Sequence, residues 1–267
     1  MSGPRVTADL RGDGLARLTL RRGEAGNAID LAMARGLLDA ARACDKVGVR
    51  AILLSAEGRS FCVGGDLREF STLTGDALAE HLTAVTEALH DALRTFAALD
   101  APLVAAVQGA VAGAGIGLAA AADVTLAADD ASFTAAYTGI GYSPDAGVSR
   151  ALPRLIGPKR ALDLLLTNRR VSAPEAAELG LVSRVVAADA LAAEAARTAE
   201  TLRRGPTAAY GATRRLVDAG LTAELGPHLD REAAALAAAA ASPEGQEGVA
   251  AFLGKRAPAY PRTAPRT

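Results

Sequence analysis

The chain has 267 residues, half of them apolar, and a formal net charge of −1. This length fits one large domain or a domain with an appendage, and the charge gives no support to a nucleic-acid or polybasic membrane surface. Cys44 and Cys62 are too few for a disulfide framework and are not spaced for zinc, so no metal is expected. Charged residues interrupt any apolar N-terminal run, and no uncharged segment is long enough to span a bilayer. We therefore expect a soluble, cytoplasmic protein.

The first part of the chain reads as strands and one helix. Residues 5–10 and 15–20 predict a hairpin, because Gly12-Asp13-Gly14 forms the turn between them. Asp30 is a plausible N-cap for a helix over 31–45, and residues 49–55 predict a buried strand. A glycine-rich turn follows in Phe61-Cys62-Val63-Gly64-Gly65-Asp66-Leu67.

The same pattern recurs at residues 101–118. Residues 103–107 are continuously apolar, which predicts a strand buried on both faces. Gly113, Gly115 and Gly117 then open an alanine-rich helix. Free N–H groups at a helix N-terminus suit an anion or a developing oxyanion, although the glycines also fit close packing alone. The two turns together could each supply one N–H to a single oxygen, or they could be unrelated loops.

The rest of the chain alternates helices and strands as far as residue 190. Thr74 and Asp76 begin a helix that reaches Phe96, and His81 and His90 fall outside its apolar face, so both read as solvated or structural. Ser143 begins a further helix, with Pro144 as its first residue, and Ser172 caps another. The remaining predicted elements are a strand at 123–127, a small-residue segment at 132–142, a helix at 160–166 and a strand at 181–186.

Helices alone follow from residue 190 to about 241, broken at Gly205-Pro206 and Gly226-Pro227, and a final helix ends near Lys255-Arg256. The pattern predicts an α/β core over 1–190, a helical region over 191–260 and a disordered tail over 261–267.

Several motifs, in order, resemble the crotonase (enoyl-CoA hydratase/isomerase) superfamily. The segments that carry this likeness are Asn27-Ala28, the turn at 61–67, Ala106-Val107-Gln108-Gly109 with Gly113-Ala114-Gly115, Ser143-Pro144-Asp145-Ala146-Gly147, residues 152–157, residues 172–176 and residues 252–256. The resemblance covers about residues 5–260. It implies a spiral of ββα units, C-terminal helices that assemble a homotrimer or a dimer of trimers, and an acyl-CoA thioester as ligand. Coenzyme A is part of that substrate, so no separate cofactor is implied.

In this family two backbone N–H groups hold the thioester oxygen, and by position these belong to Gly65 and Ala114. They stabilise an enolate, and one such donor is worth about 2.7–4 kcal/mol of barrier. A hydratase of the family carries two glutamates. Their positions match Gly117 and Tyr137 here, so a two-glutamate water addition is not expected.

Asp145 is the acid that remains at a known family position. Isomerases of the family carry an aspartate there, and a single carboxylate can move a proton along an enoyl thioester without water. An apolar pocket should raise the pKa of such a carboxylate and make it a better base. The alternative is a first-turn helix acid that complements the dipole. We expect Tyr137 and Tyr142 to shape the substrate pocket beside Gly117.

The resemblance also suggests residues for the coenzyme A portion of the ligand. These are Arg22, Ala25, Arg59, Val63, Gly65, Asp66, Leu67, Phe252 and Lys255. Each cation alone can also be a solvated surface charge. Phe252 and Lys255 are expected to reach a neighbouring subunit's ligand, and Asp66 to order its turn.

The sequence therefore predicts an enoyl-CoA isomerase that uses Asp145. Alternatives are a hydratase-like or other CoA-thioester reaction, such as ring isomerisation or C–C cleavage, and a catalytically silent CoA-binding homologue. A dinucleotide site at 113–117 is disfavoured, because the spacing is not G-x-G-x-x-G.

Overall fold

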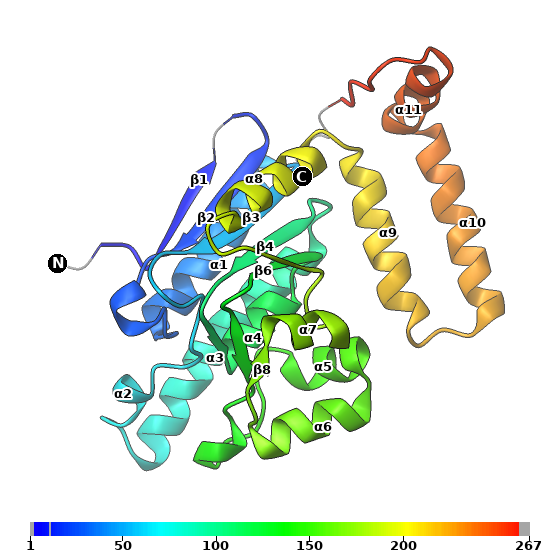
Figure 1. Cartoon of the computed structure of the whole chain (residues 1–267). Helices are drawn as coiled ribbons and strands as arrows, with labels where there is room; N and C mark the ends of the chain where they lie inside the picture. The colour runs from blue at the N-terminus through cyan, green and yellow to red at the C-terminus, as the bar shows by residue number, and fades with distance from the viewer. Residues whose placement is uncertain (1–2, 11, 262–267) are drawn as a thin grey trace.

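A six-stranded sheet forms the centre of the computed structural model, which describes residues 3–10 and 12–261. Its strands lie in the order β1-β2-β3-β4-β6-β9, with β1 antiparallel to β2 and the other pairs parallel (Figure 1). The strands are β1 (Val6–Leu10), β2 (Leu15–Leu20), β3 (Ala51–Ala56), β4 (Leu103–Val107), β6 (Val124–Ala128) and β9 (Arg184–Val186). The predicted hairpin is present, with Val6 paired to Leu20 and Leu10 to Ala16.

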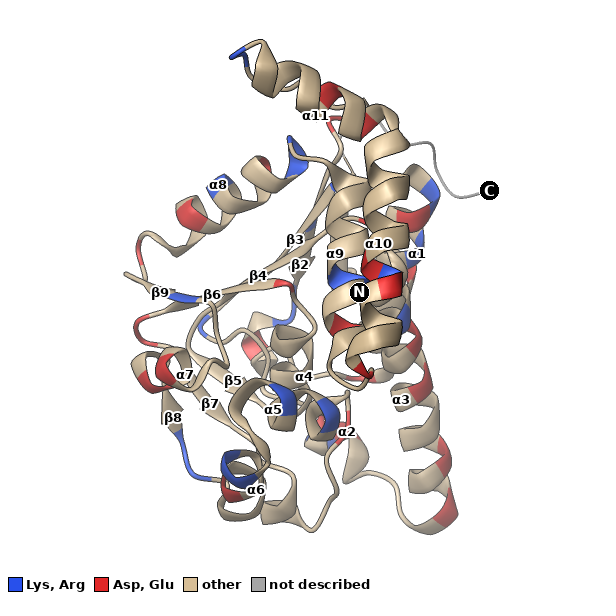
Figure 2. Cartoon of the chain, turned by 90° about the vertical axis from the view of Figure 1, so that its right-hand side faces the viewer, with Lys and Arg blue, Asp and Glu red and all other residues tan. Residues whose placement is uncertain are grey.

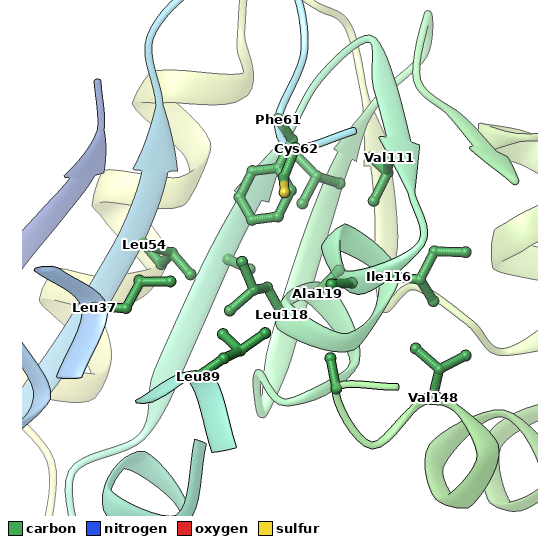
Figure 3. Packing of buried hydrophobic residues seen from close by; sticks show 14 of the residues in the cluster. Leu37, Leu54, Phe61, Cys62, Leu89, Val111, Ile116, Leu118, Ala119 and Val148 are labelled. Carbon is green, nitrogen blue, oxygen red and sulfur yellow. The ribbon is translucent and has the colours of Figure 1, made fainter. Parts of the chain in front are cut away.

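Both faces of this sheet are covered, which explains the continuous apolar run of β4. Along β3, Ile52 and Leu54 belong to the large core, whereas Ala51 and Leu53 face the opposite side. Helices α1 (Leu31–Val47) and α3 (Gly75–Ala98) pack on the first side, and α8 (Leu191–Arg203) on the second through Leu191 and its neighbours. Figure 3 shows the large core, where Leu37 lies beside Leu54 and Leu89 lies beside Leu118.

A second, three-stranded sheet extends from the first. It contains β5 (Ala110–Ala112), β7 (Ser132–Thr134) and β8 (Val171–Ser172), with β5 and β7 parallel and β8 antiparallel to β7. Two isolated parallel bridges, Cys62 with Val111 and Ile29 with Gly65, continue this sheet beyond β5. The sequence reading did not predict these three strands, because two or three residues are too few for a period-2 pattern to appear.

Short helices link the strands and three long ones end the chain. The shorter elements are η1 (Gly23–Ala25), α2 (Leu67–Phe70), α4 (Ala114–Ala120), η2 (Thr138–Ile140), α5 (Val148–Ile156), α6 (Pro158–Thr167) and α7 (Ala173–Leu179). Helices α9 (Thr207–Gly220), α10 (Leu225–Ala241) and α11 (Pro243–Leu253) project to one side of the body (Figure 1). None of the residues of α10 is buried, and its C-terminal half carries no charge (Figure 2).

Arg50 joins the chain's end to the core. Its guanidinium donates to the carbonyls of Tyr260 (3.0 Å), Pro261 (3.1 Å) and Gly205 (2.7 Å), and the residue is buried. The predicted disordered tail over 261–267 therefore begins with a placed residue, and 262–267 lie outside the described residues.

Candidate active site

The two glycine turns predicted from the sequence lie side by side. The amides of Phe61 and Ala112 donate to the carbonyls of Gln108 and Cys62, respectively, which ties residues 61–64 to β5. Gly64 has a φ of +93°, and a Cβ there would lie 3.1 Å from the carbonyl oxygen of Ala112 and 3.5 Å from the Ala114 nitrogen. Only glycine fits this close approach, so the spacing of about fifty residues does bring the two turns together.

The amides of Gly65 and Ala114 are available to a ligand. Ile29 bonds to the residues on either side of Gly65, since its amide donates to Gly64 and its carbonyl accepts from Asp66. The Gly65 amide therefore turns away from Ile29. Ala114 is the first residue of α4. Within residues 3–10 and 12–261, neither amide donates a hydrogen bond to another group, and both residues line one cavity.

This cavity has a volume of about 520 Å³ and a largely apolar wall. Helix α3 contributes Leu82, Val85, Thr86 and Leu89, and the segment between β7 and α5 contributes Ala136, Tyr137, Ile140–Ser143, Pro144 and Asp145. Phe70 closes it near Gly65, where a Cβ would lie 2.7 Å from the Phe70 ring. The cavity thus places two backbone donors and one carboxylate around a space suited to an acyl chain.

Asp145 lies in a loop and not in a helix. The expected helix start at Ser143 is wrong, because α5 begins at Val148 with Gly147 as its N-cap. Ala146 has a φ of +52° and Gly147 a φ of +75°, and this left-handed pair delays the helix and leaves Asp145 facing the cavity. Asp145 is therefore not a first-turn acid that complements a helix dipole. Strained backbone of this kind often accompanies functional sites.

His90 is a residue that the sequence reading missed. Its Nε2 lies 2.7 Å from Oδ1 of Asp145, and both side chains are about one-third exposed, at 34% and 30%. The apolar periodicity of α3 did not indicate this contact with Asp145, because His90 lies outside the buried face of the helix. The signal that was present is its position one residue after Leu89, which lines the cavity. A histidine that fixes one carboxylate oxygen leaves the other free to act on a ligand.

Tyr137 supports the same loop. Its hydroxyl donates to the backbone carbonyl of Asp145 at 3.2 Å, and the residue is buried. Burial, reinforced by the nearby Asp145 charge, raises the pKa of Tyr137 above its ordinary value, so the phenol stays neutral. Tyr142 also lines the cavity and is 38% exposed. Both tyrosines therefore line the cavity, and their contact with a substrate stays a prediction.

Gly117 does not line this cavity, contrary to expectation. A Cβ at Gly117 would lie 2.4 Å from the carbonyl oxygen and 2.7 Å from the Cβ of Ala146. The Asp145 loop therefore packs directly on α4 at this point. A side chain at position 117 would therefore require the Asp145 loop to move.

A second hollow of about 620 Å³ adjoins the first and shares Val63, Gly65 and Leu67 with it. Arg22, Ala25, Asp66 and Arg68 also line it. Six of the residues expected to contact coenzyme A thus lie together. Burial alone would raise the pKa of Asp66, but hydrogen bonds from Arg22 and from the amides of Glu69 and Arg68 outweigh it, and the pKa lies below its usual range.

Three expected contact residues lie elsewhere. Arg59 is exposed and lines neither hollow. Phe252 lies in the last turn of α11 and is 83% exposed, and Lys255 follows the helix. Figure 1 shows α11 far from α2 and α3. Within one chain they do not contribute to the site, and their role toward a neighbouring subunit stays a prediction.

The cysteines and the hollow between the C-terminal helices do not belong to this cavity. Burial raises the pKa of Cys44 and of Cys62 to about 12, so both are neutral thiols in the core. No metal-binding group of His, Cys, Asp or Glu occurs among the described residues, and no helix in that part of the chain is long and apolar enough to cross a membrane. A larger hollow of about 760 Å³ between α9, α10 and α11 has alanine as its most frequent lining residue and shares no residue with the glycine turns.

Comparisons with known proteins show the family of this chain. The model of the enoyl-CoA hydratase/isomerase family matches residues 11–263. A Rhodobacter capsulatus protein named as an enoyl-CoA hydratase is 40% identical over 93% of this chain and 95% of its own length. The 1,2-epoxyphenylacetyl-CoA isomerase of Escherichia coli is 33% identical over 92% of this chain and 95% of its own.

The fold agrees as well. A solved structure from Mycobacterium abscessus, described as an enoyl-CoA hydratase/isomerase, superposes with a TM-score of 0.91 at 38% identity, covering 97% of this chain and all of that one. The chain therefore belongs to the enoyl-CoA hydratase/isomerase family and has the crotonase fold.

Proposed function

We propose that this protein is an enoyl-CoA isomerase that shifts a double bond along an acyl-CoA thioester, with Asp145 as the base. The observation that carries this proposal is the single cavity lined by Gly65, Ala114 and Asp145. The two amides would hold the thioester oxygen and stabilise the enolate, and Asp145 would remove a proton from one carbon and return it to another.

His90 completes the proposed base. In this proposal its Nε2–H donates to Oδ1 of Asp145, so the other carboxylate oxygen faces the acyl chain. Tyr137 holds the backbone of the same residue. Both contacts fix the carboxylate before the substrate arrives, and pre-orientation of this kind is a large part of catalytic power.

A two-glutamate hydration fits these residues less well, although a 40% identical relative is named a hydratase. The steric contact of Gly117 with Ala146 leaves no room for the first glutamate, and Tyr137 occupies the place of the second. An isomerase among the relatives is consistent with the proposal.

The test is product analysis with a 3-enoyl-CoA and a 2-enoyl-CoA. We expect the wild-type protein to interconvert them without forming a 3-hydroxyacyl product. Asp145→Asn keeps the shape and removes the base, so it should lower kcat by about 10²- to 10⁴-fold, the usual contribution of a general base. Asp76→Asn, at an exposed acid in the first turn of α3, is the matched control. Wild-type rates in Asp145→Asn would rule the mechanism out.

The His90–Asp145 contact also favours a second candidate, hydrolysis of the thioester. A carboxylate beside an imidazole can act as a nucleophile, with the imidazole as base for the second step. Asp145 would attack the thioester carbon and displace CoA as its thiolate, and water activated by His90 would then cleave the anhydride. Release of free CoA thiol, measured with a chromogenic disulfide, separates this reaction from isomerisation, which releases none.

We further propose that α9, α10 and α11 join copies of the chain into a trimer or a dimer of trimers. Leu225, Leu229 and Leu236 of α10 are 51–73% exposed, and a single chain leaves all of α10 unburied. Apolar surface of this kind usually marks an interface. Sedimentation should give the mass of three or six 27.0 kDa chains, and Leu229→Glu should lower it.

A further inference from the structure

Arg22, which the resemblance suggested as a contact of the coenzyme A portion of the ligand, is paired with acidic residues of the protein itself. Its side chain is only 15% exposed. Nη1 lies 2.6 Å from Oδ2 of Asp66 and 3.3 Å from Oδ2 of Asp30, and it donates to the carbonyl of Ala28 at 3.0 Å. One nitrogen of the guanidinium thus joins two carboxylates from different helix N-termini.

This cluster holds no excess of positive charge. Asp30 caps α1 and also pairs with Nε of Arg5 at 3.1 Å, and Glu24 lies 4.0 Å from Nη1 of Arg5, so two arginines face two aspartates and a glutamate. An incoming phosphate would find no excess positive charge at Arg22. A partly buried pair of this kind is screened little by salt, and removing one partner leaves the other charge uncompensated.

Asp66 connects this cluster to the glycine turn at 61–67, which carries the Gly65 amide. Asp66 immediately follows Gly65 and is only 5% exposed. Its Oδ1 accepts hydrogen bonds from the amides of Arg68 (3.0 Å) and Glu69 (3.2 Å) at the start of α2. The carboxylate therefore fixes the chain on the C-terminal side of Gly65, while Arg22 fixes the carboxylate.

The segment that carries Arg22 also holds the chain before Gly65. The side chain of buried Asn27 accepts from the Arg22 amide and donates to the carbonyls of Glu57 and Ser60. The amide of Val63 donates to Gly26 at 3.1 Å, and that of Ile29 to Gly64 at 2.7 Å. Hydrogen bonds with residues 22–30 thus hold residues 57–66 in position.

We propose that Arg22 is a positioning residue, which sets the direction of the Gly65 amide through Asp66. This inference rests on the proposed function, in which that amide holds the thioester oxygen. Because the oxygen gains charge only as the enolate forms, a misdirected amide weakens the transition state more than the bound substrate. Arg22 should therefore affect kcat more than KM.

The experiment compares an enoyl-CoA with the matching enoyl-pantetheine thioester, which lacks the nucleotide and its phosphates. Arg22→Gln should lower kcat on both esters by at least about tenfold, a fraction of the 10²–10³ that loss of a whole oxyanion donor costs. Arg22→Lys keeps a charge near Asp66 and should recover part of the loss. Arg42→Gln, an exposed arginine on α1, is the matched control and should match wild type.

Asp66→Asn provides an independent arm, because the amide oxygen can still cap α2 while the charge is lost. It should reproduce the kcat loss, and the double variant should lose little more, because both changes break one contact. A loss confined to the CoA ester, unchanged kcat on both esters, or additive effects would each overturn the inference. An inactive wild-type protein would instead refute the proposed function.

Discussion

Gly117→Ala tests the contact that distinguishes this site from a two-glutamate site. The added Cβ would lie 2.4 Å from the Ala146 carbonyl oxygen and 2.7 Å from its Cβ, whereas relaxed carbon contacts are about 3.5–4.0 Å. Ala146 must therefore move by about 1 Å or more. Since Asp145 is its neighbour in the chain, the carboxylate moves with it, and a shift of 1 Å can cost about 10²-fold in rate.

Stability and activity should respond differently to this change. Overpacking costs about 1–3 kcal/mol, but alanine in place of glycine favours a helix by about 1 kcal/mol. The net loss is thus at most about 2 kcal/mol, and the melting temperature should fall by only a few degrees. Isomerase kcat, in contrast, should fall by about 100-fold. Gly117→Glu should be at least as inactive and should gain no hydratase activity.

The assays are thermal unfolding and steady-state turnover on a 3-enoyl-CoA, with Gly12→Ala as the control because a Cβ there meets nothing within 4 Å. Full activity in Gly117→Ala would show that Ala146 and Asp145 are not rigidly coupled, and a hydrating Gly117→Glu would refute the steric argument outright.

Three other results should follow. His90→Ala should lower kcat by about 10- to 100-fold, because a hydrogen bond to a charged group is worth about 1.5–3 kcal/mol. His90→Gln keeps a hydrogen-bond donor and should lose less activity. Equal losses of kcat in the two variants would contradict an orienting role for His90. Cys44 and Cys62 should resist iodoacetamide at pH 8 until the protein unfolds, since burial raises their pKa to about 12, and rapid native labelling seen by mass spectrometry would be inconsistent with this. Because the folded pKa of Asp66 lies below its ordinary 3.8, its contribution to stability is present above about pH 4 and is lost as pH falls toward the folded value. Urea unfolding at several pH values should therefore show a weaker acid dependence in Asp66→Asn, and an unchanged dependence would count against that linkage.

The main helices and the strands of the large sheet could be predicted from the sequence because their patterns are long. The period of α3 and the apolar run of β4 are local signals, and buried strands and amphipathic helices produce them regardless of what lies far away in the chain. The family motifs added the meeting of Gly65 and Ala114, which no periodicity could show.

The features that were missed depend on contacts between distant segments. Nothing near His90 indicates that a loop 55 residues later brings a carboxylate to its ring. Ser143 and Pro144 form a good local helix start, but Ala146 and Gly147 adopt left-handed conformations, and the helix begins only at Val148. Arg22 looked like a free cation because its two acidic partners are separated from it in sequence by 8 and 44 residues.

The Arg50 anchor bears on how shortened forms of this protein should be designed. Tyr260 and Pro261 supply two of the three carbonyls that accept hydrogen bonds from this buried guanidinium, and Gly205, just before α9, supplies the third. A stop codon placed ahead of Tyr260 would remove two acceptors from the buried Arg50 guanidinium. It would also weaken the attachment of the segment before α9, which Arg50 holds through Gly205. Trimming for crystallisation should therefore preserve everything through Pro261.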